Sequence, residues 1–119
     1  MTLGKQLYIF KAKVLRVIDG DTLVIDLDMG FETHTIKRVR LLGVDTPERG
    51  QVNYNEAKAF TTQTVLGKDV YVQTYQADAF GRYLADVWYR EGDNEYRLSH
   101  ELSNRGLAKE CSKWNEEDK

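Results

Sequence analysis

The sequence has little cysteine and proline, and it has no long apolar run. Cys111 is the single cysteine among 119 residues, so neither an internal disulfide nor a cysteine metal cluster can form. We interpret it as a small, partly buried apolar side chain. Pro47 is the single proline. No stretch is long and apolar enough to span a bilayer, so we expect no membrane partner.

Neither sign of charge dominates. The net charge is −2, which argues against a surface that binds polyanions in general, although one bound divalent cation would neutralise it. The length predicts one domain, residues 1–119, with a core at about 8–110 and an acidic tail at about 115–119. No apolar stretch follows the first lysine, so we expect an intracellular chain or a secreted chain whose signal is already removed.

Apolar and β-branched residues predict five strands, separated by turn residues. The expected ranges are 8–18, 22–27, 33–44, 70–75 and 83–89. Asp19-Gly20 is a hairpin signal between the first two strands. In the third strand, Val39 and Leu41 point to one side and Arg40 points to the other.

Two helices are predicted between and after these strands. Asn53 and Glu56 resemble a capping box, and this helix runs through Val65 to Gly67. Ser99 is expected to cap a second, short helix that ends at Gly106. The element order indicates an α+β, mainly β fold: a five-stranded OB-type barrel in meander or Greek-key order with two helices. We expect tyrosines to pack in this barrel, namely Tyr54, Tyr71, Tyr75, Tyr83 and Tyr89.

Short polar clusters lie at the ends of the predicted strands. They are Asp19-Gly20-Asp21-Thr22, Arg40, Asp45-Thr46-Pro47-Glu48, Asp78 and Gly81-Arg82. Taken one at a time, each is explained by turn chemistry or by a solvated side chain. The case for a functional site therefore depends on their occurrence together and in this order.

Their chemistry suits phosphodiester hydrolysis. Asp21 starts the second strand and Asp45 ends the neighbouring third strand, and with the Thr46 carbonyl they form an all-oxygen ligand set that favours calcium or magnesium. Glu48 lies just past the turn and is placed to take a proton from water. Arg40 and Arg82 offer guanidinium groups that grip phosphate oxygens at two points.

Four segments resemble the thermonuclease (staphylococcal nuclease) family over about residues 8–110. They read VIDGDT at 17–22, VRLLGVDTPE at 39–48, DAFGRYLA at 78–85 and NRGLAK at 104–109. The resemblance implies a five-stranded OB barrel and a nuclease that uses one calcium ion to cleave DNA and RNA, leaving 3′-phosphates. It implies that Asp21, Asp45 and Thr46 bind the metal, that Asp19 supports them nearby, and that Arg40, Glu48 and Arg82 are catalytic.

The chain departs from the family's pattern around the substrate. The segment between Glu48 and the first helix is shorter, and the long C-terminal helix of many relatives is not present in this sequence. Phe80 replaces a frequent tyrosine, and Ser112 stands where another is expected, with Trp114 nearby to stack on a base. Substrate contacts are therefore expected from Asp78, Phe80 and Trp114.

Three functions fit this sequence. The first is a calcium-dependent nuclease acting on DNA or RNA as a monomer without an obligate protein partner. The second is a nuclease-like module that binds nucleic acid or protein without catalysis. The third is a protein-interaction barrel whose acidic turns are purely structural.

Overall fold

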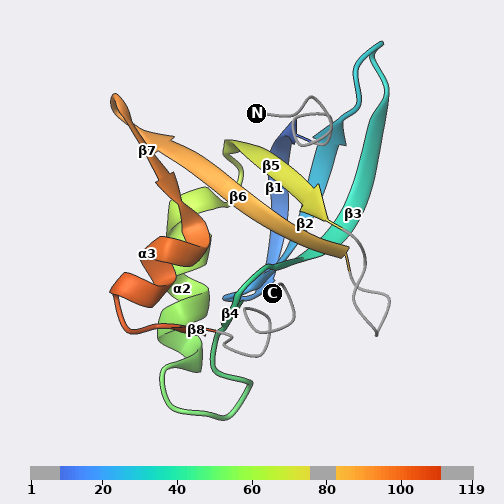
Figure 1. The fold of residues 1–119 in the computed structure, drawn as a ribbon. Coiled ribbons are helices and arrows are strands. Elements are labelled where there is room, and N and C mark those ends of the chain that lie inside the picture. Colours follow the sequence, from blue (N-terminus) through green and yellow to red (C-terminus); the bar gives the residue numbers. More distant parts are fainter. Residues whose placement is uncertain (1–8, 76–82, 111–119) are drawn as a thin grey trace, which may run out of the picture.

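The computed structural model describes residues 9–75 and 83–110, and it shows a closed barrel with helices on one side (Figure 1). The barrel strands are β1 (Ile9–Asp19), β2 (Thr22–Asp28), β3 (His34–Leu41), β5 (Asp69–Tyr75) and β6 (Tyr83–Glu91). They pair antiparallel in the order β3-β2-β1-β5-β6, and β3 closes the barrel by pairing parallel with β6. The predicted five-stranded OB-type barrel is confirmed.

The long strand β1 pairs with two neighbours because it bends. Its first part, Ile9–Lys13, pairs with β5, and the part from Ala12 to Asp19 pairs with β2. The β1–β2 register shifts twice in the second part, and such bulges increase local twist and bend a strand. The two-residue turn at Gly20–Asp21 places the end of β1 beside the start of β2, at one rim of the barrel.

The core follows the alternation that the sequence predicts. Val39 and Leu41 are buried inside the barrel, whereas Arg38, which precedes Val39, is exposed; Arg40 between the two points outward but is buried at the rim. The other fully enclosed apolar side chains of the barrel strands are Val14, Leu23, Ile25, Val72, Ala85 and Val87. Successive side chains of a strand point to opposite faces, so the inward set fixes which residues face outward.

Two helices cover one side of the barrel and contact each other. They are α2 (Tyr54–Val65) and α3 (Leu98–Asn104), which lie side by side in Figure 1. Ala57, Thr61 and Val65 form the fully buried face of α2. Neither of these described helices has the length and hydropathy needed to cross a membrane.

The predicted cap position of the first helix is right but its side-chain bond is absent, and the predicted cap of the second helix is wrong. Asn53 precedes α2 with φ of 70° and makes no side-chain capping bond, because a side-chain cap requires extended backbone at this position. The second helix begins at Leu98, so Ser99 lies inside its first turn instead of capping it. Leu98 is fully buried, and this packing sets the start of α3.

Three short strands were not predicted. β4 (Val44–Asp45) and β8 (Lys109–Glu110) form a separate two-stranded ladder, and β7 (Asn94–Arg97) pairs with β6. Asp45 therefore lies on β4, after a turn at Leu42–Gly43, and not at the end of the third strand. Gly43 has φ of 84°, which breaks strand geometry there.

The tyrosines divide into two groups. Tyr54 and Tyr89 are buried, as expected for packing residues. Tyr71, Tyr75 and Tyr83 are 38%, 37% and 46% exposed, so their assignment to barrel packing is wrong. Tyrosine tolerates both settings because its ring is apolar and its hydroxyl is polar.

Candidate active site

A pocket of about 1110 Å³ opens at the rim where β1 ends, β2 begins and the chain leaves β4. Its walls come from the strand ends, from the loop between β4 and α2, and from residues 106–109. Every predicted site residue that lies in the described ranges borders this pocket: Asp19, Asp21, Arg40, Asp45, Thr46 and Glu48. Three of the five predicted polar clusters thus share one cavity, and the other two, Asp78 and Gly81-Arg82, lie outside the described residues.

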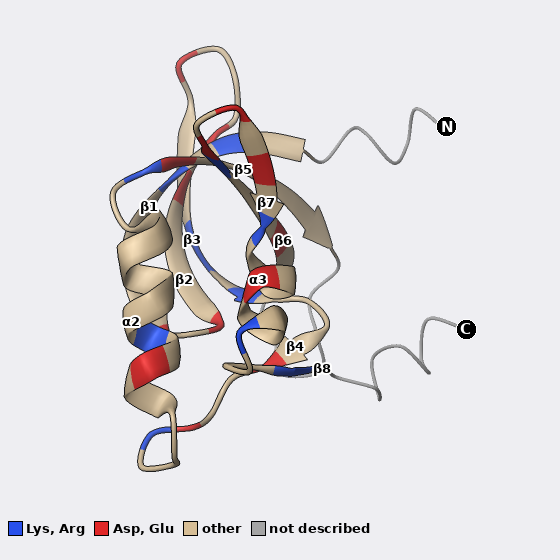
Figure 2. Cartoon of the chain, turned by 90° about the vertical axis from the view of Figure 1, so that its left-hand side faces the viewer, with Lys and Arg blue, Asp and Glu red and all other residues tan. Residues whose placement is uncertain are grey.

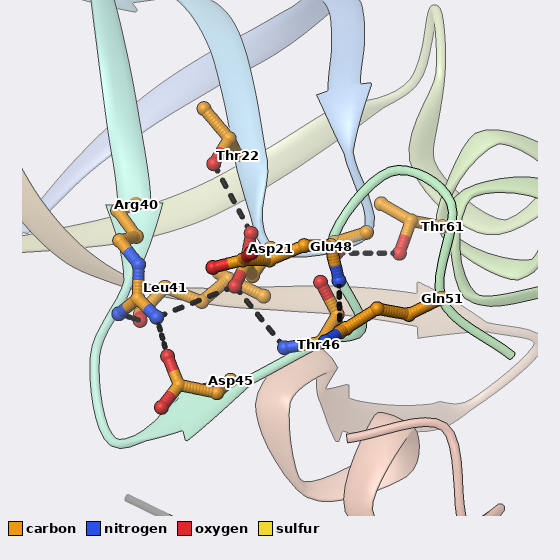
Figure 3. Close-up of polar contacts among 10 residues, drawn as sticks. Asp21, Thr22, Arg40, Leu41, Asp45, Thr46, Glu48, Gln51 and Thr61 are labelled. Atoms are coloured by element: carbon orange, nitrogen blue, oxygen red, sulfur yellow. Dashed lines mark hydrogen bonds and ion pairs between the residues drawn. The ribbon is translucent and has the colours of Figure 1, made fainter. Parts of the chain in front are cut away.

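The guanidinium of Arg40 lies between two carboxylates (Figure 3). Its Nη2 is 3.4 Å from Oδ2 of Asp21 and forms a close ion pair with Oδ1 of Asp45. Its Nη1 donates to the backbone carbonyl of Leu41 at 3.4 Å. The two acidic side chains that sequence reasoning assigned to a cation therefore converge on one positive group.

Asp21 is held by donors on both of its oxygens. The Thr22 hydroxyl donates to Oδ1 at 3.1 Å, and the Thr46 backbone N–H donates to Oδ2 at 3.2 Å. The Asp21 side chain is 9% exposed and the Asp45 side chain is 54% exposed. One carboxylate is thus fixed in the wall of the pocket, and the other reaches solvent.

Helix α2 fixes the turn that carries Asp19 and Asp21. The Tyr54 hydroxyl donates to Oδ1 of Asp19 at 2.8 Å, and the Thr61 hydroxyl donates to the Gly20 carbonyl at 2.8 Å. A β-carbon on Gly20 would lie 3.0 Å from Cβ of Ala57. Glycine is needed here because the helix packs directly on the turn backbone.

Glu48 borders the same pocket from the loop after β4. Its residue is exposed, and its backbone N–H donates to Oε1 of Gln51 at 2.7 Å (Figure 3). The Gln51 N–H returns a bond to the Glu48 carbonyl at 2.9 Å. This reciprocal pair holds the loop while leaving the Glu48 carboxylate open to the cavity.

Comparison with known proteins decides the family. Residues 38–119 match the family described as staphylococcal nuclease homologue. The thermonuclease of Staphylococcus hyicus is 37% identical over 106 residues, covering 82% of this chain and 54% of the relative. The thermonuclease of Staphylococcus intermedius is 39% identical over 104 residues, covering 81% and 56%. The chain belongs to the staphylococcal nuclease family.

A third relative of this nuclease-family chain is an uncharacterized endonuclease of Escherichia coli. It is 33% identical over 82 residues, covering 69% of this chain and 50% of the relative. The chain spans about half the length of these relatives. The activity of the whole protein is therefore proposed below from the site.

The remaining predicted site residues lie outside the described ranges: Asp78, Phe80, Arg82 and Trp114. For Arg82, the nearest described landmark is Tyr83, the first residue of β6. Tyr83 pairs with Val39, the neighbour of Arg40. The strand that follows Arg82 thus begins beside the strand that carries Arg40.

Sequence reasoning missed residues that support or line the pocket of this nuclease-family chain. Tyr54, Thr61 and Gln51 make the supporting hydrogen bonds, and the cations Arg49 and Lys109 border the cavity. Tyr54 had been assigned to packing alone. Its contact joins residues 35 positions apart, and no local pattern in the sequence reports such a distance.

The residues of this site fit a hard cation. In residues 9–75 and 83–110, no group of three or more Asp, Glu, His or Cys side chains gathers as a metal site. Two carboxylates nevertheless converge on a single positive group, and no histidine or cysteine is among the described residues that line the pocket. The Thr46 hydroxyl is buried beside them without a hydrogen-bond partner in the described structure, which leaves one more oxygen available.

Proposed function

We propose that this chain is a calcium-dependent nuclease that hydrolyses phosphodiester bonds of DNA or RNA. The observation that carries the proposal is the convergence of Asp21 and Asp45 on one positive group in a pocket that also exposes Glu48. Membership of the staphylococcal nuclease family supports this reaction class, and 3′-phosphate products follow from the family resemblance.

In this proposal, Glu48 acts on the attacking water and the arginines act on the phosphate. A carboxylate oxygen of Glu48 accepts a proton from the attacking water, because this residue is exposed to the pocket and carries no cation partner among the described residues. Arg40 stabilises charge on the phosphate with the N–H groups that its two carboxylates leave open. We assign the second guanidinium to Arg82.

Calcium would be held by the Asp21 and Asp45 carboxylates and the Thr46 carbonyl, supported by Asp19. When bound, it supplies positive charge against the phosphate oxygens as negative charge develops there. Asp21 is already oriented by Thr22 and Thr46, so its oxygens need no rearrangement to act as ligands. Asp45 can adjust because half of its side chain reaches solvent.

Cleavage of single-stranded DNA and RNA, with calcium and then with excess chelator, tests this function. We expect product with calcium, none with chelator, and recovery when calcium is restored. Metal-independent cleavage would contradict the assigned cofactor. Calcium-dependent binding of an intact substrate without turnover would favour the non-catalytic module instead.

Tyr54→Phe is expected to raise the calcium concentration for half-maximal activity about tenfold, as loss of a group that supports a metal ligand does. The change deletes the hydroxyl that donates to Asp19 and keeps the buried ring. The measurements are calcium titrations of activity and of the calcium-induced thermal shift. Tyr96→Phe is the matched control, because Tyr96 stacks on Tyr89 away from the pocket. An unchanged calcium response in Tyr54→Phe would show that the contact does not support the metal site.

A further inference from the structure

The outward face of β1, β2 and β3 continues from the pocket as a series of cross-strand rows. The first row is Asp19, Thr22 and Arg40, which border the pocket. The next row contains Arg16, Val24 and Arg38, because Arg16 pairs with Val24 and Val24 pairs with Arg38. We call this second set the Arg16–Arg38 row. It lies two residues from the pocket along β2 and β3, or about 7 Å, and three residues along β1, where the register shifts.

The Arg16–Arg38 row carries two cations and no acid. Both arginines are exposed, and among the described residues neither has an ion pair, a hydrogen bond or a ring contact. Some other outward cations are compensated, since Arg97 binds Asp86 and Lys37 lies over the ring of Tyr83, whereas Arg90 on β6 is also unpaired among the described residues. Two uncompensated guanidinium groups next to the pocket are notable in a chain of net charge −2.

The basic surface on these three strands is short. In the third row, Lys13 lies opposite Asp26 in the strand register. The Asp26 carboxylate contacts the His34 ring at 3.1 Å. A carboxylate therefore ends the positive surface one row beyond Arg16 and Arg38. Figure 2 colours the Lys and Arg positions of β1 and β3 blue and the Asp and Glu positions red. The row has room for one anionic group adjacent to the pocket.

We propose that the Arg16–Arg38 row binds a phosphate of the nucleic acid next to the one being cleaved. The inference depends on the proposed function, because the substrate in the pocket brings further phosphates along its backbone. Strands two apart lie about 9.5 Å from each other, so two long guanidinium side chains can close on one phosphate above Val24. The free cations of this row thus select a polynucleotide over a single phosphodiester.

The test compares Arg16→Gln/Arg38→Gln with the parent chain, and Arg90→Gln is the matched control. Arg90 is likewise exposed and unpaired among the described residues, but it borders a separate hollow with Lys11 and Tyr71. Binding of a fluorescent single-stranded oligonucleotide is measured in chelator at several salt concentrations. We expect the double variant to bind about tenfold more weakly, with its slope of log K against log salt reduced by about 0.7 to 1.4.

Cleavage in calcium supplies the second measurement. The double variant should have a raised KM for the oligonucleotide and unchanged kcat/KM for a chromogenic ester with one phosphate. Oligonucleotide binding and salt dependence equal to the parent would overturn the role of the row, whatever the cleavage result. Absence of cleavage by the parent chain would overturn the proposed function, and the binding measurement would still decide the row.

Discussion

Glu48→Gln is expected to lower kcat by about 10²- to 10⁴-fold, the usual contribution of a general base. The amide keeps the size and polarity of the side chain but cannot accept a proton from water. Glu48 contributes to the loop through its backbone bond to Gln51, which the substitution retains. The free energy of unfolding should therefore change by less than about 0.5 kcal/mol, as for other exposed positions.

Glu56→Gln is the matched control for that variant. Glu56 is also an exposed glutamate near the pocket loop, but it lies in the first turn of α2 and does not border the cavity. Its activity should equal that of the parent chain. The measurements are initial rates with single-stranded DNA in calcium and urea unfolding of each variant. Full activity in Glu48→Gln would remove the assigned base from the mechanism.

The barrel could be predicted because its determinants are local. The Asp-Gly hairpin signal indicates which strands pair. The alternation of Val39, Arg40 and Leu41 indicates which side chains face the core. The helix caps could not be predicted in the same way. Asn53 matches a cap by residue type, but its backbone is left-handed. The start of the second helix is set by Leu98, which is buried in the core. Both outcomes depend on tertiary packing, which overrides local preference.

For the described part of the candidate site, the sequence indicated which residues lie near one another but not how they contact one another. Strand order explains why Asp21, Arg40 and Asp45 share a rim, and that order was readable from the sequence. The ion pair between Arg40 and Asp45 was not readable, because it depends on the turn at Leu42–Gly43 that sets β4 back toward β3. Arg40 was predicted to hold phosphate, and in the structure its guanidinium contacts two carboxylates.

Because Arg40 contacts two carboxylates, Arg40→Met is expected to lower stability as well as activity, unlike Glu48→Gln. Removing the guanidinium leaves Asp21, 9% exposed, without its cation and beside a second carboxylate. Loss of one partner of a buried ion pair costs roughly 3–5 kcal/mol, and the exposure of Asp45 reduces this to an expected ~2–3 kcal/mol. Activity should fall by at least about 10²-fold, because a donor to the phosphate is lost as well.

Arg97→Met is the matched control, because it breaks another pair with a buried carboxylate. Arg97 Nη2 lies 2.7 Å from Oδ2 of Asp86, whose side chain is 2% exposed, and neither residue borders the pocket. Arg97→Met should lose comparable stability, measured by urea unfolding, and keep the kcat of the parent chain at a temperature where it is folded. A loss of activity in both variants would mean that Arg40 acts only through stability.

The calcium-induced change in Tm tests whether Arg40 and the cation share the same two carboxylates. In the parent chain, a cation bound between Asp21 and Asp45 competes with the guanidinium that already contacts both. In Arg40→Met the two carboxylates repel each other, so a bound cation relieves more unfavourable energy. The calcium-induced rise in Tm should therefore be larger in Arg40→Met than in the parent chain or in Arg97→Met. An equal rise in all three would show that Arg40 and the cation do not share these carboxylates.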